Sequence, residues 1–310
     1  MIRSSIDIGT NSVLLLIADI STETIQVIQE EQQIPRLGQG VDQTDKLSDE
    51  AQHRVLSVLM DYKALLDLNY PGISSVTIVT ATSAVRDAEN RSEFINSVYQ
   101  HTGWHVMLLS GPQEAQMTYK GALSVLGCEY QTSANTVLDI GGGSTEIASG
   151  RGKDLEKWDS LNMGSVRFTE RFLKNNPPTQ AQVDEARNEV RSMLKVWSPS
   201  KNIKTEKLIC VAGTVTSMAG IEMESDTYDA EIINGHRLTP TFIETMINRL
   251  KRMKAEDIEA QYPVFLKGRG DVILGGLIIL LEFIDYCNFD KFTVSTGGIR
   301  HGTLTEKYQQ

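Results

Sequence analysis

A six-residue sequence that occurs twice constrains the fold of this chain more than any other feature. Residues 7–12 read DIGTNS and residues 139–144 read DIGGGS, so the copies agree at four of six positions and lie 139 − 7 = 132 residues apart. Each copy follows one apolar strand pattern and precedes another. A single copy would be an ordinary turn, because Asp and Gly are common turn residues. Two copies, each heading three predicted strands, indicate duplicated domains that face a common cleft.

The apolar periodicity predicts a similar order of elements in both halves, and therefore an α/β fold. In the first half we expect strands near 4–7, 13–19, 25–29, 75–80 and 106–109, and helices after Ser48 and over 92–101. In the second half we expect strands at 135–139, 145–148, 155–161, 208–212 and 291–295, and helices at 179–197, after Thr239, at 272–286 and at 303–310. Ser48 and the pair Thr179 and Gln182 are predicted helix caps.

Length and composition narrow the class of protein. The 310 residues predict about two domains, and 30 Lys and Arg against 40 Asp and Glu give a net charge of −10, which excludes a broadly basic nucleic-acid binder. The longest apolar run, 272–281, is shorter than the ~20 residues of a membrane-spanning helix, and Asp7 precedes any signal-peptide core. Three widely spaced cysteines argue against a disulfide framework and a zinc site. We therefore expect a soluble, cytoplasmic protein without nucleic-acid or membrane partners.

Both turns have the chemistry of a phosphate site. Glycines allow consecutive N–H groups to converge on one anion, and the neighbouring Thr, Asn and Ser residues add neutral donors. Neither turn contains a lysine, and the chain has no GxxxxGK[ST] phosphate loop, so a divalent cation is expected to neutralise the phosphate. Asp139 and Glu146 could hold Mg²⁺, which commonly binds one or two carboxylates together with substrate phosphates.

Further segments follow in order along nearly the whole chain: ATSAVRDAENR at 81–91, SGPQEA at 110–115, LDIGGGSTE at 138–146, NMGSVRFTE at 162–170, VAGTVTS at 211–217, GRGDVILGGL at 268–277 and STGGIRHG at 295–302. Together with the first turn they resemble the exopolyphosphatase/guanosine pentaphosphate phosphohydrolase (Ppx/GppA) family. The resemblance implies two duplicated ribonuclease-H-like domains, as in the actin-like ATPase superfamily, with a cleft between them. We place them at 1–121 and 122–300, with a helix at about 301–310 that packs back on the first.

The resemblance also implies an activity and the residues for it. The expected enzyme is a Mg²⁺-dependent, homodimeric exopolyphosphatase that releases orthophosphate from inorganic polyphosphate or guanosine pentaphosphate. Glu114 corresponds to the glutamate that activates water, Asp139 and Glu146 to the Mg²⁺ partners, and Arg86 to an arginine that reaches the terminal phosphates. The residues expected to cradle phosphates are Asp7, Gly9, Thr10, Asn11, Ser12, Gly141, Gly142, Gly143, Ser144 and Thr145. Further candidates are Arg167 and Arg269 as phosphate ligands, and Gly213, Thr214, Gly297 and Gly298, which either line the cleft or only pack closely.

The chain departs from the family pattern at two places. Many relatives have two adjacent acids before the alanine of SGPQEA and an arginine after it, whereas this chain has Gln113, Glu114 and Gln116, so substrate contacts there are expected to differ. Longer members carry extra C-terminal helical domains, which leaves processive degradation of long chains open.

Two other functions remain open. A small-molecule or sugar kinase of the same fold would transfer the γ-phosphate of ATP to a hydroxyl group, and a non-catalytic alarmone or nucleotide sensor would not need Glu114. Polyphosphate and guanosine pentaphosphate are not distinguished by the sequence, because both end in the same anhydride.

Overall fold

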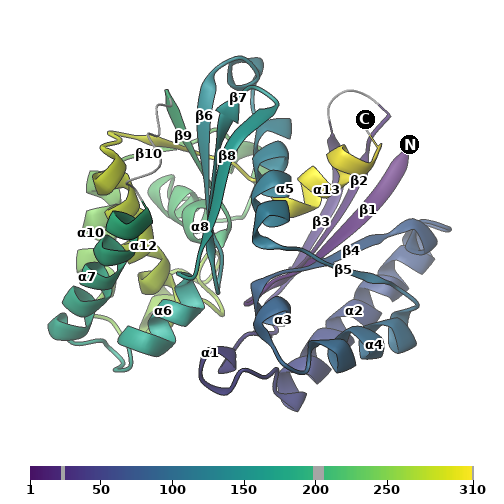
Figure 1. Ribbon diagram of the computed structural model, residues 1–310, viewed down its shortest axis with the longest axis horizontal. Coiled ribbons are helices and arrows are strands. Elements are labelled where there is room, and N and C mark those ends of the chain that lie inside the picture. The colour runs from purple at the N-terminus through teal and green to yellow at the C-terminus, as the bar shows by residue number, and fades with distance from the viewer. Residues whose placement is uncertain (22–24, 198–205, 309–310) are drawn as a thin grey trace. The chain divides into compact units, whose positions relative to one another are not determined.

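The computed structural model describes residues 1–21, 25–197 and 206–308, which form two compact units (Figure 1). Unit 1 comprises residues 1–125 together with 297–310, and unit 2 comprises residues 126–296. The chain therefore leaves unit 1 once, completes unit 2, and returns.

Unit 1 is built on a five-stranded sheet in the order β3-β2-β1-β4-β5. The first three strands are antiparallel, whereas β4 and β5 run parallel to β1. The strands are β1 (Ile2–Ile8), β2 (Val13–Asp19), β3 (Gln26–Gln33), β4 (Ile78–Ala81) and β5 (Val106–Leu108). The helices are α1 (Val41–Thr44), α2 (Asp49–Asn69), α3 (Ser83–Asp87), α4 (Arg91–Thr102), α5 (Gly111–Ser124) and α13 (Ile299–Tyr308).

Side-chain alternation along β2 places apolar residues on both faces of this sheet. Leu15 packs with residues of α2 such as Leu59, whereas Leu16 packs with Leu304 of α13. Both faces of the sheet are therefore covered, one by α2 and its neighbours and the other by α13, which also packs along α5.

Unit 2 is built on a six-stranded sheet in the order β10-β11-β9-β6-β7-β8. Strands β6, β7 and β8 are antiparallel, β9 and β11 follow parallel to β6, and β10 adds an antiparallel edge. The strands are β6 (Ala134–Ile140), β7 (Thr145–Arg151), β8 (Asp154–Leu161), β9 (Lys207–Val211), β10 (Arg237–Leu238) and β11 (Phe292–Val294). The helices are α6 (Ser165–Phe172), α7 (Gln180–Trp197), α8 (Gly213–Glu222), α9 (Ala230–Ile233), α10 (Pro240–Leu250), α11 (Ala255–Gln261) and α12 (Ile273–Cys287).

The two sheets share one topology: a three-stranded antiparallel meander whose first strand is followed by two parallel strands. This confirms the predicted α/β fold with a duplicated ribonuclease-H-like unit. The second copy differs by the edge strand β10 and by α12, which is buried along most of its length because α6, α7 and α10 pack around it.

Several local predictions are confirmed and two need correction. The N–H of Thr179 donates to Oε1 of Gln182 at 3.0 Å and the N–H of Gln182 donates to Oγ1 of Thr179 at 3.3 Å, which is the predicted capping box. The strand expected at 75–80 begins only at Ile78, because residues 74–76 form a 3₁₀ turn. The closing helix expected at 303–310 begins already at Ile299; residues 309–310 lie outside the described residues. Among the described helices, none has the length and apolarity needed to cross a membrane.

Candidate functional site

Both copies of the hexapeptide fold into the same turn. The N–H of Gly9 donates to the carbonyl oxygen of Ser12 at 2.9 Å, and the N–H of Gly141 donates to that of Ser144 at 3.0 Å. A Cβ at either glycine would lie 3.1 Å from the same serine oxygen, so both turns leave equally little room for a side chain. The repeat is therefore a repeat of backbone geometry as well as of sequence.

The turn of unit 2 is held by the start of α6. The N–H groups of residues 165–167 and Nε of Arg167 donate to the carbonyl oxygens of residues 141–143 at 2.8–3.1 Å. Gly164 permits this approach, since a Cβ there would overlap the carbonyl group of Gly142. Because the C=O and N–H of a trans peptide point in opposite directions, the N–H groups of residues 142–144 point away from α6. This arrangement can bind an anion.

The turn of unit 1 is held in the same way by the loop that follows β3. The N–H of Arg36 donates to the carbonyl oxygen of Asn11 at 3.0 Å, and the N–H of Gly38 donates to that of Thr10 at 2.8 Å. The Thr10 hydroxyl lies 3.0 Å from the hydroxyl of Ser83, at the start of α3. The Asn11 side chain is 8% exposed, and its amide nitrogen has no hydrogen-bond partner among the described residues. A buried donor without a partner is costly, which points to a ligand acceptor at this turn.

Two buried carboxylates face each other beside the turn of unit 2. Asp139 and Glu146 are direct partners in the β6–β7 register and are 8% and 3% exposed. Ser160, the partner of Glu146 on β8, donates its hydroxyl to the Glu146 carboxylate at 2.7 Å. Opposed like charges are destabilising unless they are neutralised, so the pair fits a cation. In unit 1 the residue opposite Asp7 is Leu14, and Asp7 accepts a hydrogen bond from the Thr80 hydroxyl at 3.2 Å.

Among the described residues no cluster of three or more His, Cys, Asp or Glu side chains could hold a metal. Mg²⁺ does not need one, because it is commonly held by one or two carboxylates with water and phosphate oxygens completing its octahedron. The pair of carboxylates at Asp139 and Glu146 matches this mode of Mg²⁺ binding.

The buried Glu114 and the half-buried Arg86 form an ion pair in unit 1. Nη1 of Arg86 contacts Oε1 of Glu114 and also donates to the carbonyl oxygen of Leu109 at 3.0 Å. The Glu114 side chain is 3% exposed and that of Arg86 24% exposed. Arg86 lies in the last turn of the short helix α3, which begins with the Ser83 that contacts Thr10. One helix of five residues thus connects the phosphate turn to the expected catalytic carboxylate.

The beginning of α5 explains one departure from the family pattern. Ser110 caps the helix, and its N–H donates to Oε1 of Gln113 at 2.9 Å, which completes a capping box. Glu and Gln serve equally at this position of a capping box. Gln113 is exposed whereas Glu114 is buried, so the acid that many relatives have at position 113 would belong to the exposed helix cap and not to the buried surroundings of Glu114.

Among the further candidates, Gly213 and Gly297 lie in close packing contacts. A Cβ at Gly213, the first residue of α8, would overlap the Arg269 guanidinium. Burial lowers the pKa of Arg269, although an arginine stays charged near neutral pH. Thr214 lies against Gly276 of α12, and Gly297 lies against the carbonyl group of Gly121, whereas a Cβ at Gly298 would meet no atom within 4 Å.

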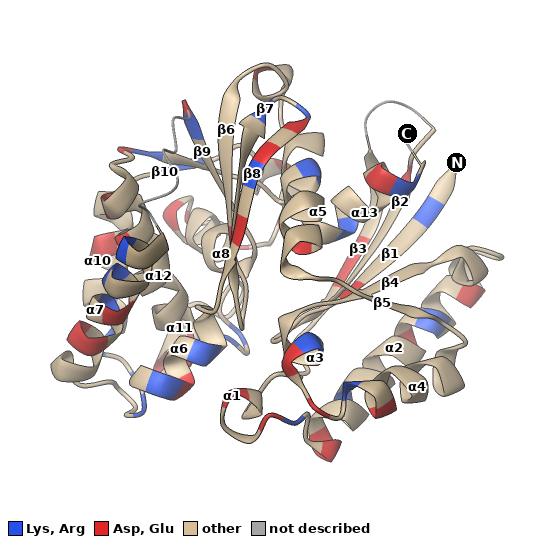
Figure 2. Ribbon diagram, in the orientation of Figure 1, with Lys and Arg blue, Asp and Glu red and all other residues tan. Residues whose placement is uncertain are grey.

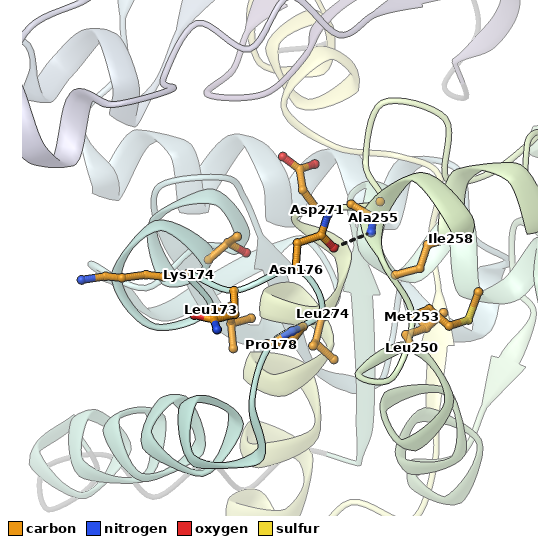
Figure 3. A pocket seen from close by; sticks show the side chains of 13 residues that line it. Leu173, Lys174, Asn176, Pro178, Leu250, Met253, Ala255, Ile258, Asp271 and Leu274 are labelled. Carbon is orange, nitrogen blue, oxygen red and sulfur yellow. Dashed lines mark hydrogen bonds between the residues drawn. The ribbon is translucent and has the colours of Figure 1, made fainter.

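A separate pocket of about 200 Å³ lies in unit 2, between α6, α10, α11 and α12 (Figure 3). Its floor is apolar, with Leu173, Leu250 and Leu274 among the lining residues. Figure 3 shows that Lys174 and Asp271 extend away from it, and Oδ1 of Asn176 accepts a hydrogen bond from the N–H of Ala255 at 2.8 Å. None of its thirteen lining residues is a predicted site residue, and its polar groups do not converge, so it is not the candidate site.

The structure thus gathers the predicted residues into two groups. Unit 1 brings together the turn at 9–12, Arg86 and Glu114, and unit 2 brings together the turn at 141–144, Asp139, Glu146 and Arg167. Both groups lie where parallel strands end, which is the common place for ligands in α/β sheets. The expectation that they share a cleft stays a prediction. Ser83 and Ser160 were not among the predicted site residues. Ser83 lies within the segment ATSAVRDAENR, whereas the place of Ser160 beside Glu146 follows only from the strand register.

Comparisons with known proteins identify the family of this chain. A sequence model of the Ppx/GppA phosphatase family matches residues 16–310. Exopolyphosphatase 2 of Mycobacterium tuberculosis is 33% identical over 96% of this chain and 96% of its own. A bifunctional 3-dehydroquinate synthase/phosphatase of Fusobacterium nucleatum is 35% identical over 98% of this chain, which spans 46% of that relative's length. The crystal structure of the Aquifex aeolicus member of the Ppx/GppA family superposes with a TM-score of 0.81 at 30% identity, covering 100% of this chain and 98% of that one.

Proposed function

Because the chain belongs to the Ppx/GppA phosphatase family, we propose that it is a Mg²⁺-dependent hydrolase that releases the terminal phosphate of inorganic polyphosphate or guanosine pentaphosphate. A relative matched over nearly its whole length is named an exopolyphosphatase, which supports the first of these substrates. The observation that carries the proposal is the buried Glu114, paired with Arg86 in the unit that holds the turn at 9–12.

Glu114 is proposed to act as the general base. Its carboxylate accepts the proton of a water molecule that attacks the terminal phosphorus in line with the leaving oxygen. Arg86 orients this carboxylate in the free protein, and its guanidinium has further N–H groups for a phosphate oxygen. Phosphoryl transfer has a loose transition state, so most of the catalysis is expected from positioning and charge neutralisation.

The two turns are proposed to bind phosphate oxygens. In unit 2 the N–H groups of residues 142–144 are oriented away from α6 by the hydrogen bonds of their own peptides. In unit 1 the Asn11 amide supplies a buried donor. Asp139 and Glu146 would hold Mg²⁺, which neutralises charge that develops on the phosphates.

Incubation of the purified chain with polyphosphate or guanosine pentaphosphate and Mg²⁺, without any acceptor, tests the proposal. We expect release of orthophosphate by the wild type and a loss of at least about 100-fold in Glu114→Gln, since general bases typically contribute that much. Gln113→Glu, one position away on the exposed cap, is the matched control and should keep its activity. Binding of polyphosphate to Glu114→Gln should persist, and loss of binding as well would assign Glu114 another role.

Magnesium binding has a test that does not depend on activity. A ligand present at 100 times its Kd stabilises a folded protein by about 2.7 kcal/mol. We expect Mg²⁺ to raise the melting temperature of the wild type, but not that of Asp139→Asn or Glu146→Gln. An equal rise in all three proteins would rule out this pair as the site.

The alternatives predict different results in the same assays. A kinase of this fold would need ATP and a hydroxyl acceptor, and a nucleotide sensor would be unaffected by Glu114→Gln. We further propose a homodimer, as the family resemblance implies, and light scattering at several protein concentrations tests it.

A further inference from the structure

The loop between β3 and α1 is tied to the phosphate turn of unit 1. Arg36 and Gly38 donate their N–H groups to the carbonyl oxygens of Asn11 and Thr10, at 3.0 and 2.8 Å. On its other side, Nε of Arg54 on α2 donates to the carbonyl oxygen of Pro35 at 2.8 Å. The loop is therefore held from two directions, and the Arg36 backbone has a defined place beside the turn.

Arg36 adopts a backbone conformation that favours glycine. Its φ is 55°, in the left-handed region, where a residue with a Cβ is strained. Glycine would supply the same N–H at this position without the strain, and the loop does use glycine at 38 and 40. Strained residues of this kind cluster at ligand sites, where the side chain has a use. The strained conformation therefore indicates that the Arg36 guanidinium has a function.

The other phosphate turn has an arginine in the equivalent place. Arg167 donates its N–H to the carbonyl oxygen of Gly142 and its Nε to that of Gly143. Gly143 corresponds to Asn11 in the repeat, because 11 + 132 = 143. Arg36 lies in the loop after β3 and Arg167 at the start of α6 after β8, so both arginines follow the third strand of the duplicated meander. Each turn therefore has an arginine at this carbonyl, which Arg36 contacts through its backbone N–H and Arg167 through Nε of its guanidinium.

A cation at this position would neutralise the negative charge of a phosphate bound to the turn. The hexapeptide contains no Lys or Arg, the protein has a net charge of −10, and Figure 2 shows Lys and Arg interspersed with Asp and Glu along the described chain. A phosphate on the turn at 9–12 must therefore be neutralised locally. An arginine suits this purpose, because its planar guanidinium donates two parallel hydrogen bonds to phosphate oxygens.

We propose that Arg36 is a phosphate-binding residue of the turn at 9–12: its N–H positions the turn, and its guanidinium binds an oxygen of the phosphate chain held there. This inference rests on the proposed function and adds to it a residue outside the recognised motifs. It also assigns the ligand class at that turn, a phosphate group within a linear polyphosphate.

Because glycine suits the left-handed Arg36 backbone, Arg36→Gly removes the side chain and keeps the backbone conformation of the loop. Arg36→Gly and Arg36→Ala both keep the N–H that donates to the carbonyl oxygen of Asn11. Arg36→Lys keeps the positive charge but lacks the planar guanidinium. Arg3→Ala, at the opposite end of β1 from the turn, makes the same change in net charge and is the matched control. The measurements are KM and kcat for Mg²⁺-polyphosphate hydrolysis, the melting temperature, and the binding of fluorescent polyphosphate to the same substitutions in the Glu114→Gln background.

We expect KM and the Kd for polyphosphate to rise about tenfold in both Arg36→Gly and Arg36→Ala, which is the effect of losing one charge-assisted hydrogen bond. The kcat should change less than threefold, Arg36→Lys should recover part of the loss, and Arg3→Ala should match the wild type. Wild-type KM and Kd in Arg36→Gly would overturn the inference. A wild-type chain that binds polyphosphate through Arg36 without hydrolysing it would overturn only the proposed function, and one that does neither would overturn both.

Discussion

His301 shows how burial changes the chemistry of a single residue in this protein. It lies in α13 and is 1% exposed, and its Nδ1 is buried without a hydrogen-bond partner among the described residues. Burial, assisted by the charge of Arg300, lowers its pKa from 6.5 to about 3. The folded protein therefore keeps this imidazole neutral, whereas the unfolded chain takes up a proton as the pH falls below about 6.5.

Stability that depends on the neutral His301 is fully present above pH 6.5 and is lost as the pH falls towards 3. The loss is about 1.4 kcal/mol per pH unit, or about 2 kcal/mol between pH 6.5 and 5. We expect His301→Leu to remove this component, so that its free energy of unfolding, from urea titrations, falls less steeply with acid than that of the wild type. His53→Gln, on the exposed side of α2, should follow the wild-type profile. Parallel profiles for the wild type and His301→Leu would contradict the expected burial.

At the scale of residues, the candidate groups have two sources. The repeat points to Asp139 and the glycines of both turns, whereas Glu114 and Arg86 were assigned through the family resemblance, and their roles stay predictions. The sequence alone could not identify Ser160, because its contact with Glu146 depends on the pairing of two strands. Arg36 was missed for a similar reason, since a left-handed backbone is a property of the folded loop.

At the scale of elements, the contact between α5 and α13 depends on glycines in both. A Cβ at Gly121 would overlap the carbonyl oxygen of Gly298, and one at Gly302 would overlap that of Met117. These positions allow the helix that closes the chain to lie directly against the helix that carries Glu114.

We expect Gly121→Ala to destabilise the protein by about 1–3 kcal/mol, the usual cost of overpacking, since a backbone atom must move. Gly298→Ala is the matched control from the other side of the same contact. It should change the free energy of unfolding by less than about 0.5 kcal/mol, because its Cβ would meet nothing within 4 Å. Thermal melts of both variants measure the difference, and equal melting temperatures would show that the contact is looser than described.

Most elements were predictable because the period of the apolar residues and the positions of the helix-capping residues indicated the same boundaries. The three strands that head each half were predicted from their apolar patterns, and α7 from its Thr179 capping box. The prediction was wrong at 75–77, which precede β4; there the Ser75 hydroxyl donates to the carbonyl oxygen of Gly72, and local hydrogen bonding competes with strand pairing. The early start of α13 depends on packing against α5, which no local pattern records.

At the scale of the whole molecule, the two units share one sheet topology but differ in the number of chain segments that form them. Unit 2 is one continuous segment that contains its whole sheet and the helices around α12. Unit 1 needs both ends of the chain, because Leu304 of α13 completes the core beside Leu16. The repeat predicted two similar units, but it did not reveal that the first is closed by the last residues of the chain.

This difference predicts which fragments of the chain fold when they are expressed separately. Residues 126–296 expressed alone should unfold cooperatively, whereas residues 1–125 alone should lack a sharp thermal transition, since the sheet face beneath α13 is exposed. Val125 and Gly297 are adjacent in space, so a short glycine linker from 125 to 297 can restore α13 and should restore the transition. Circular dichroism melts of the three fragments measure this. A cooperative melt of 1–125 at the temperature of the linked fragment would show that α13 contributes little, and that the sheet of unit 1 is stabilised mainly by the face that packs against α2.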